Sequence, residues 1–196
     1  MYNKMPKRRT ICWTPTWNKD REGIGLEHLI LEERVADSIV LALDDEHGPF
    51  RLTYRLTWDE SWCVRQAVLS VVTETSTRSI RLETDGQGRW QDGDGRARDD
   101  LEGCLDVDIW PTPFTNSFPM GREAMAVGDR RQFRMAWIFG PDLTVRPQPQ
   151  AYTRLAERLY RFESLDGSGF TAERPVDDDR IVLDYPALFR RVRDFR

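Results

Sequence analysis

Two carboxylates, Asp106 and Asp108, are the residues best placed to do chemistry in this chain. They alternate with Leu105, Val107 and Ile109, a pattern typical of a β-strand with one apolar face. Both carboxylates then share the other face, with Cβ atoms about 6.5–7 Å apart. That spacing suits an acid–base pair or a shared cation. The structural alternative is a solvent-facing strand, or carboxylates that accept hydrogen bonds from the backbone N–H groups of the following loop.

A polar and aromatic loop follows this strand. Pro111 and Pro113 end the strand because proline has no N–H to donate to a ladder. Arg65 has apolar neighbours and, if buried, would need Asp106, Asp108 or an anionic ligand headgroup as a partner; otherwise it is a surface arginine. The residues predicted to bind a ligand are Arg65, Trp90, Asp106, Asp108, Trp110, Thr115, Asn116 and Tyr185.

No sequence motif indicates a metal or cofactor, and neither is expected. The chain has no Cys-x-x-Cys and only two histidines, which argues against zinc. Asp92-Gly93-Asp94-Gly95 fails the calcium-loop template at later positions and is a turn. Cys104 has no histidine placed beside it as a base, so a buried inert thiol is expected rather than a nucleophile.

Composition describes a soluble globular protein. The 196 residues are 39% hydrophobic and 32% charged, with a net charge of −4, which gives no general support for nucleic-acid binding. No stretch is long and apolar enough to span a membrane, and no signal peptide is apparent. Three widely spaced cysteines suit reduced thiols in the cytoplasm. We expect one domain over residues 1–196, with residues 1–9 as a loosely ordered tail and the basic residues at both ends exposed to solvent.

Alternating patterns predict β-strands along most of the chain. The clearest runs from Phe50 to Trp58, with apolar residues at every second position. Other predicted strands cover residues 30–33, 38–43, 62–75, 78–84 and 133–139, with turns at 85–86 and 91–95. Apolar spacing from Tyr152 to Leu159 favours a helix, and Pro186–Val192 suits a short terminal helix.

Several segments together resemble the bacterial family labelled "putative glycolipid-binding". They include Pro49–Tyr54, Asp85–Trp90, Gly103–Ile109, Thr112–Asn116, Tyr152–Leu155, Phe170–Ala172 and Asp184–Arg190. The resemblance implies a mainly β fold, a single antiparallel sheet rolled into a spiral β-roll or half-open barrel with one or two short helices. It also favours strand around Tyr160–Phe162, against the helical spacing. Ala187 and Trp110 depart from the family pattern, and no catalytic or ligand-binding roles are carried over.

The favoured function is that of a binding or carrier protein for a glycolipid or other amphiphile. A rolled sheet rich in aromatic residues can enclose an apolar cavity, with polar groups at its mouth to hold a headgroup. Two alternatives remain: an enzyme that uses Asp106 and Asp108 as acid and base on a small polar substrate, and a structural protein without a ligand. The oligomeric state is left open.

Overall fold

The protein, seen here as a computed structural model, is built from two β-sheets that share one core. Residues 8–16 and 25–195 are described. The larger sheet is antiparallel, in the order β13-β14-β1-β2-β3-β4-β5-β6-β7. Its strands are β1 (Arg8–Pro15), β2 (Gly25–Glu32), β3 (Val35–Asp44), β4 (Gly48–Trp58), β5 (Val64–Thr73), β6 (Thr77–Thr84), β7 (Trp90–Asp92), β13 (Asp184–Tyr185) and β14 (Phe189–Phe195).

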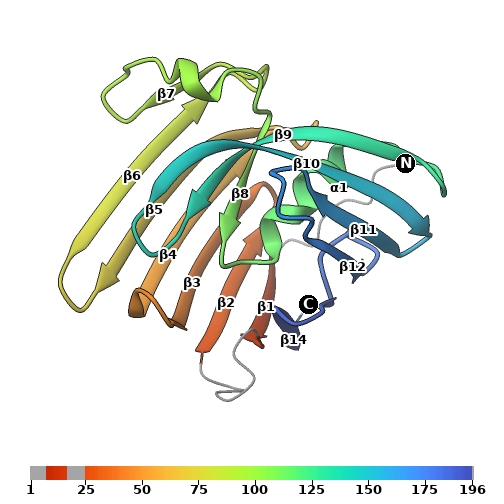
Figure 1. The fold of residues 1–196 in the computed structure, drawn as a ribbon, viewed down its shortest axis with the longest axis horizontal. Helices are drawn as coiled ribbons and strands as arrows, with labels where there is room; N and C mark the ends of the chain where they lie inside the picture. The colour runs from red at the N-terminus through yellow and green to blue at the C-terminus, as the bar shows by residue number, and fades with distance from the viewer. Residues whose placement is uncertain (1–7, 17–24, 196) are drawn as a thin grey trace.

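The smaller sheet has the order β12-β11-β10-β9-β8. Its strands are β8 (Asp106–Trp110), β9 (Arg130–Phe139), β10 (Thr144–Ala156), β11 (Leu159–Ser164) and β12 (Thr171–Pro175). In Figure 1 the teal β9 and β10 arch over the green α1 (Ser117–Arg122), with the orange-to-yellow strands of the larger sheet beyond. The mainly β, rolled architecture is therefore confirmed, but the strands form two sheets, and β8 pairs with β9 in parallel.

Alternation in the sequence explains the strands of the larger sheet. In β4, Phe50, Leu52, Tyr54, Leu56 and Trp58 are all buried while the residues between them face outward. β5 lies between β4 and β6, an internal position consistent with its apolar residues on both faces.

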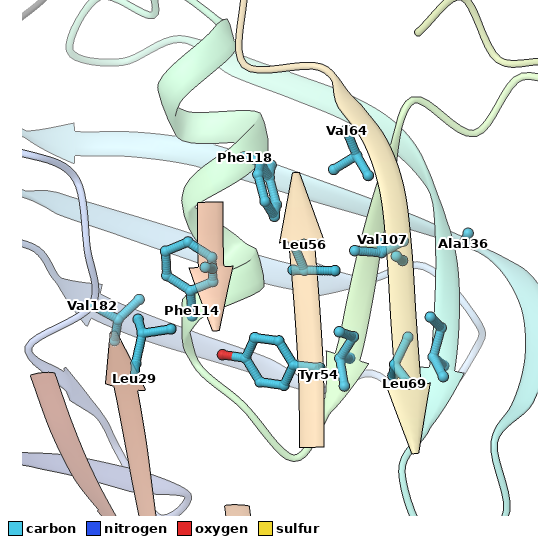
Figure 2. Close-up of a cluster of buried hydrophobic side chains, with 14 of the residues drawn as sticks. Leu29, Tyr54, Leu56, Val64, Leu69, Val107, Phe114, Phe118, Ala136 and Val182 are labelled. Atoms are coloured by element: carbon cyan, nitrogen blue, oxygen red, sulfur yellow. The ribbon is translucent and has the colours of Figure 1, made fainter. Parts of the chain in front are cut away.

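Side chains from both sheets and from α1 fill the space between the sheets. Figure 2 shows Phe114 and Phe118 pointing from the helical segment toward Tyr54 and Leu56 of β4, with Val107 of β8 alongside. All five are buried in one hydrophobic cluster. The space between the two sheets is thus a packed core, as protein interiors usually are.

Local apolar spacing favoured a helix in two segments that are strands in the structure. Pro186–Val192 is not a helix, because the chain forms β13 and then pairs β14 with β1. The segment from Tyr152 to Leu159 is extended, as the family resemblance indicated: it belongs to β10 and β11, joined by a tight turn. In both places strand pairing overrides the local apolar spacing. Within the described residues, no helix is long and apolar enough to cross a membrane.

The first and last strands are held together by a buried ion cluster around Arg9. Of the predicted tail, residues 1–7 lie outside the described part, whereas Arg8 and Arg9 belong to β1. The Arg9 side chain is 0% exposed and donates hydrogen bonds to Asp177, Asp179 and Asp194, with the nearest oxygen of Asp179 at 2.8 Å. Arg191 of β14 also pairs with Asp177, at 2.7 Å. The prediction that both basic ends face solvent is therefore wrong for Arg9 and Arg191.

We expect Arg9→Met to lower the free energy of unfolding by about 3–5 kcal/mol, because it removes the buried cation that Asp177, Asp179 and Asp194 share. Arg8→Met is the matched control: Arg8 is the preceding residue, its side chain is 66% exposed, and its ion pair with Glu32 spans 3.7 Å. The control should change stability by less than about 0.5 kcal/mol. Urea denaturation of the two variants measures this, and equal effects would contradict a structural role for the cluster.

Candidate functional site

The two carboxylates of β8 have different partners, so they do not form a pair. Asp106 is fully buried and forms an ion pair with Arg122 at the end of α1. Burial raises the pKa of Asp106 to about 6, although the charge and hydrogen bond of Arg122 oppose the shift. Asp106 therefore anchors α1 to the smaller sheet, and Arg122, not Arg65, is the cation that it pairs with.

Asp108 instead braces the loop that follows β8. Its carboxylate accepts hydrogen bonds from the Gln150 amide and, at 3.3 Å, from the Thr115 hydroxyl. Hydroxyls of the loop threonines accept from two backbone N–H groups: Thr115 Oγ1 from Ile109 N at the end of β8, and Thr112 Oγ1 from Phe114 N of the loop, both at 3.1 Å. One sequence-based alternative has the carboxylates accept from the N–H groups of the loop directly. The threonines take that role because their short side chains reach back to the backbone.

A pocket of about 310 Å³ opens between the inner face of the smaller sheet and the last two strands of the larger one. Its apolar lining includes Ile109, Trp110, Trp137, Phe162, Phe170 and Phe189. Its polar lining includes Asp108, Asn116, Gln148, Asp166, Arg174 and Tyr185. The volume lies at the lower end of the range for ligand pockets, roughly 300–1,000 Å³.

Aromatic rings form two groups at this pocket. In the first, Trp110 and Trp137 both stack on Phe139, with interplanar angles of 24° and 20°. In the second, the ring of Phe170 contacts those of Phe162 and Tyr185, with ring centroids 6.0 and 6.3 Å away. Flat aromatic faces of this kind offer apolar contact without conformational freedom.

Arg174 lines the pocket and is 1% exposed. Its guanidinium carbon lies over the rings of Phe162 and Tyr185, 3.9 and 3.8 Å from the ring centroids. It donates hydrogen bonds to Asn116 Oδ1 and to the Tyr185 hydroxyl. Asn116 Oδ1 also accepts from Tyr152 at 2.8 Å. The cation is therefore fixed in place by rigid neighbours.

Gln148 contributes a second fixed polar group. Its amide nitrogen donates to Ser164 at 3.1 Å and to Asp166 at 3.5 Å. Its buried carbonyl oxygen Oε1 has no partner among the described residues. Asp166 stays ionised, because hydrogen bonds from Ser168 lower its pKa to about 2. Burial raises the pKa of Asp108, against the hydrogen bond from Gln150 and the charge of Arg174.

The structure brings together only part of the predicted ligand-binding set. Asp108, Trp110, Asn116 and Tyr185 all line this pocket, and Thr115 lies behind Asp108. Arg65 and Trp90 line a separate surface pocket, where Arg65 is exposed and bonds to the Asp85 carbonyl. Asp106 is not part of the lining, so Asp106 and Asp108 do not face one common pocket in which they could act as an acid–base pair.

Sequence reasoning missed Glu27, a buried acid directly behind the loop. Its carboxylate oxygen Oε1 accepts hydrogen bonds from Thr112 at 2.8 Å, Tyr54 at 2.5 Å and Ser38 at 3.0 Å. Thr112 also lines the pocket. Burial raises the pKa of Glu27 to about 7, although the three hydrogen bonds oppose the shift. Alternation offered a signal, because Glu27 shares the inward face of β2 with Leu29 and Leu31.

The described residues offer neither a reactive thiol at Cys104 nor a cluster of metal ligands. Cys104 is a buried free thiol, and burial raises its pKa, which disfavours the reactive thiolate. Among residues 8–16 and 25–195, no group of three or more His, Cys, Asp or Glu side chains is arranged to hold a metal ion.

Glu27 makes stability depend on pH. Its pKa is raised on folding from 4.5 to about 7, so the folded state binds the proton more tightly and stability falls as pH rises across that window. Relative to Glu27→Gln, the wild type should lose up to about 3 kcal/mol between pH 4.5 and pH 7, at 1.36 kcal/mol per pKa unit. Denaturation of both proteins at several pH values measures the difference. The control is Glu32→Gln on the exposed end of β2, and a wild-type curve parallel to that of Glu27→Gln would contradict the prediction.

Comparisons with known proteins agree with the fold just described. The crystal structure of a DUF1089 family protein from Pseudomonas aeruginosa is similar, with a TM-score of 0.85, 46% sequence identity, and coverage of 88% of this chain and 94% of that chain. No match was found among curated proteins. The model of the family described as "Putative glycolipid-binding" matches residues 14–191. This chain belongs to that family.

Proposed function

We propose that this protein binds an amphiphile, with a glycolipid as the favoured class, and that the pocket between the two sheets holds the polar head. The observation that carries the proposal is the lining of that pocket, which combines the aromatic rings of Trp110 and Phe162 with the polar side chains of Asn116, Gln148 and Arg174. The family's description agrees with this class of ligand.

The polar groups suit a hydroxyl-rich head. The unpartnered Gln148 Oε1 is a buried acceptor that a sugar hydroxyl can satisfy. Asp108 and Asp166 add acceptors, and Asn116 and Tyr185 are held rigidly beside them. The aromatic faces of Trp110 and Phe162 can pack against the apolar C–H faces of a sugar ring.

The size of the pocket indicates that the head and the tail of the ligand bind in different places. A volume of about 310 Å³ suits a head of one sugar ring rather than a whole lipid. The core between the sheets is already filled by side chains, so the tail is not expected there. Phe170, which is 39% exposed at the rim, offers an apolar exit for the first carbons of a tail. This differs from the prediction from the sequence, in which an apolar cavity inside the roll encloses the apolar part of the ligand.

Tryptophan fluorescence tests the proposal, because Trp110 and Trp137 lie in the lining. Octyl glycosides with neutral and acidic heads should bind below their micelle concentration, and the free sugars should bind at least about tenfold more weakly, about 1.4 kcal/mol. Trp110→Ala should weaken binding about tenfold through lost apolar contact. Trp62→Ala is the control, since Trp62 is also partly buried but lies against Trp58 and Phe118, outside the pocket. Absence of binding by every octyl glycoside would refute the proposal.

A further inference from the structure

Two arginines of the described residues are fully buried, and they differ in one respect. Arg9 and Arg174 are 0% and 1% exposed. Arg9 is surrounded by the carboxylates of Asp177, Asp179 and Asp194. Arg174 forms no ion pair with any carboxylate in residues 8–16 and 25–195; its hydrogen-bond acceptors are an amide oxygen and a phenol oxygen. Burying a cation without an anionic partner lowers the free energy of unfolding, so the presence of Arg174 at this position suggests a role other than stability.

Arg174 also has unused donors. A guanidinium carries five N–H groups, and Asn116 and Tyr185 accept from two nitrogens, one bond each. The Nε–H group is buried and unpartnered. The remaining donors belong to a planar fork, the geometry that matches a carboxylate or phosphate with two parallel hydrogen bonds.

The surroundings leave the charge of Arg174 available to a ligand. Asp108, the carboxylate coupled to Arg174 through space, already accepts from Gln150 and Thr115, and burial raises its pKa. Asp166 accepts from the Ser168 backbone and from Gln148. The rings of Phe162 and Tyr185 lie against the guanidinium carbon, so an incoming anion would bind the N–H donors at the edge of the guanidinium.

We propose that Arg174 is the subsite for an anionic oxygen group, a carboxylate, phosphate or sulfate, on the head of the bound amphiphile. This inference rests on the proposed function and narrows its ligand to acidic amphiphiles. Gln148 Oε1 then accepts from a hydroxyl of the same head, while Arg174 donates to the acidic group. The two orphaned buried groups of the pocket, one acceptor and one cation, are satisfied together by an acidic sugar.

The test compares octyl β-D-glucuronide with octyl β-D-glucoside at pH 7.5, since the two differ only in a carboxylate replacing the CH₂OH group. The wild type should bind the glucuronide at least about tenfold more tightly, the gain expected of a charge-assisted bidentate contact. Arg174→Gln should reduce this preference to about twofold or less, and Arg174→Lys should keep part of it. Arg130→Gln is the control, because Arg130 is exposed and pairs with Glu163; it should leave the preference unchanged.

The outcomes separate this inference from the proposed function. Equal binding of both octyl glycosides by the wild type overturns the Arg174 subsite and leaves amphiphile binding intact, even if Arg174→Gln fails to fold. Binding of neither overturns both. Free glucuronate and inorganic phosphate are tested in the same way. If both bind more weakly than octyl glucuronide, the anionic group belongs to the head of an amphiphile. If either binds as tightly as octyl glucuronide, the ligand is a water-soluble anion and the amphiphile is ruled out.

Discussion

The pairing of β1 with β14 is the constraint on which the rest of the structure depends. It brings the two ends of the chain into one sheet, and Arg9 fastens them by bonding to carboxylates from the C-terminal segment. That pairing in turn holds β13 and the residues before β14 opposite the smaller sheet. Tyr185 and Phe189 line the pocket only because these strands are held there. The ion cluster around Arg9, which is not part of the pocket lining, thus determines one wall of the pocket.

Local patterning predicted much of the fold. Strict alternation identified β4 and β9, because a sheet with one buried face imposes that period, whereas β5 was recognised from a run that is apolar on both faces. The segment of β1 was missed because its two arginines suggested a solvated tail, and the burial of Arg9 depends on partners about 170–185 residues away. Helix α1 was missed because Pro119 and Gly121 are poor helix formers; its buried residues hold it by packing against the core.

The site was only partly predictable for a related reason. Asp108, Trp110 and Asn116 belong to one continuous segment, so a single strand and its loop disclosed them. Arg174, Gln148 and Phe162 come from three other strands, and nothing in their local sequence marks them as neighbours. Arg65 was selected for its apolar neighbours, but it lies on the outward face of β5. The sequence pattern shows on which face of its strand a residue lies. It does not show which strands, distant in the sequence, pack together to form a binding site.

The closure of β1 by β14 also has a consequence for the order of folding. Arg9 leaves the ribosome early, and its partner Asp194 follows 185 residues later. Until β14 has been synthesised, β1 can pair only with β2, and its other side is an open sheet edge that can recruit a foreign strand. Contacts of such sequence separation form slowly, because the entropy of closing the loop is lost before the contacts can compensate for it. The nascent chain is therefore exposed to misassembly until β14 has been synthesised.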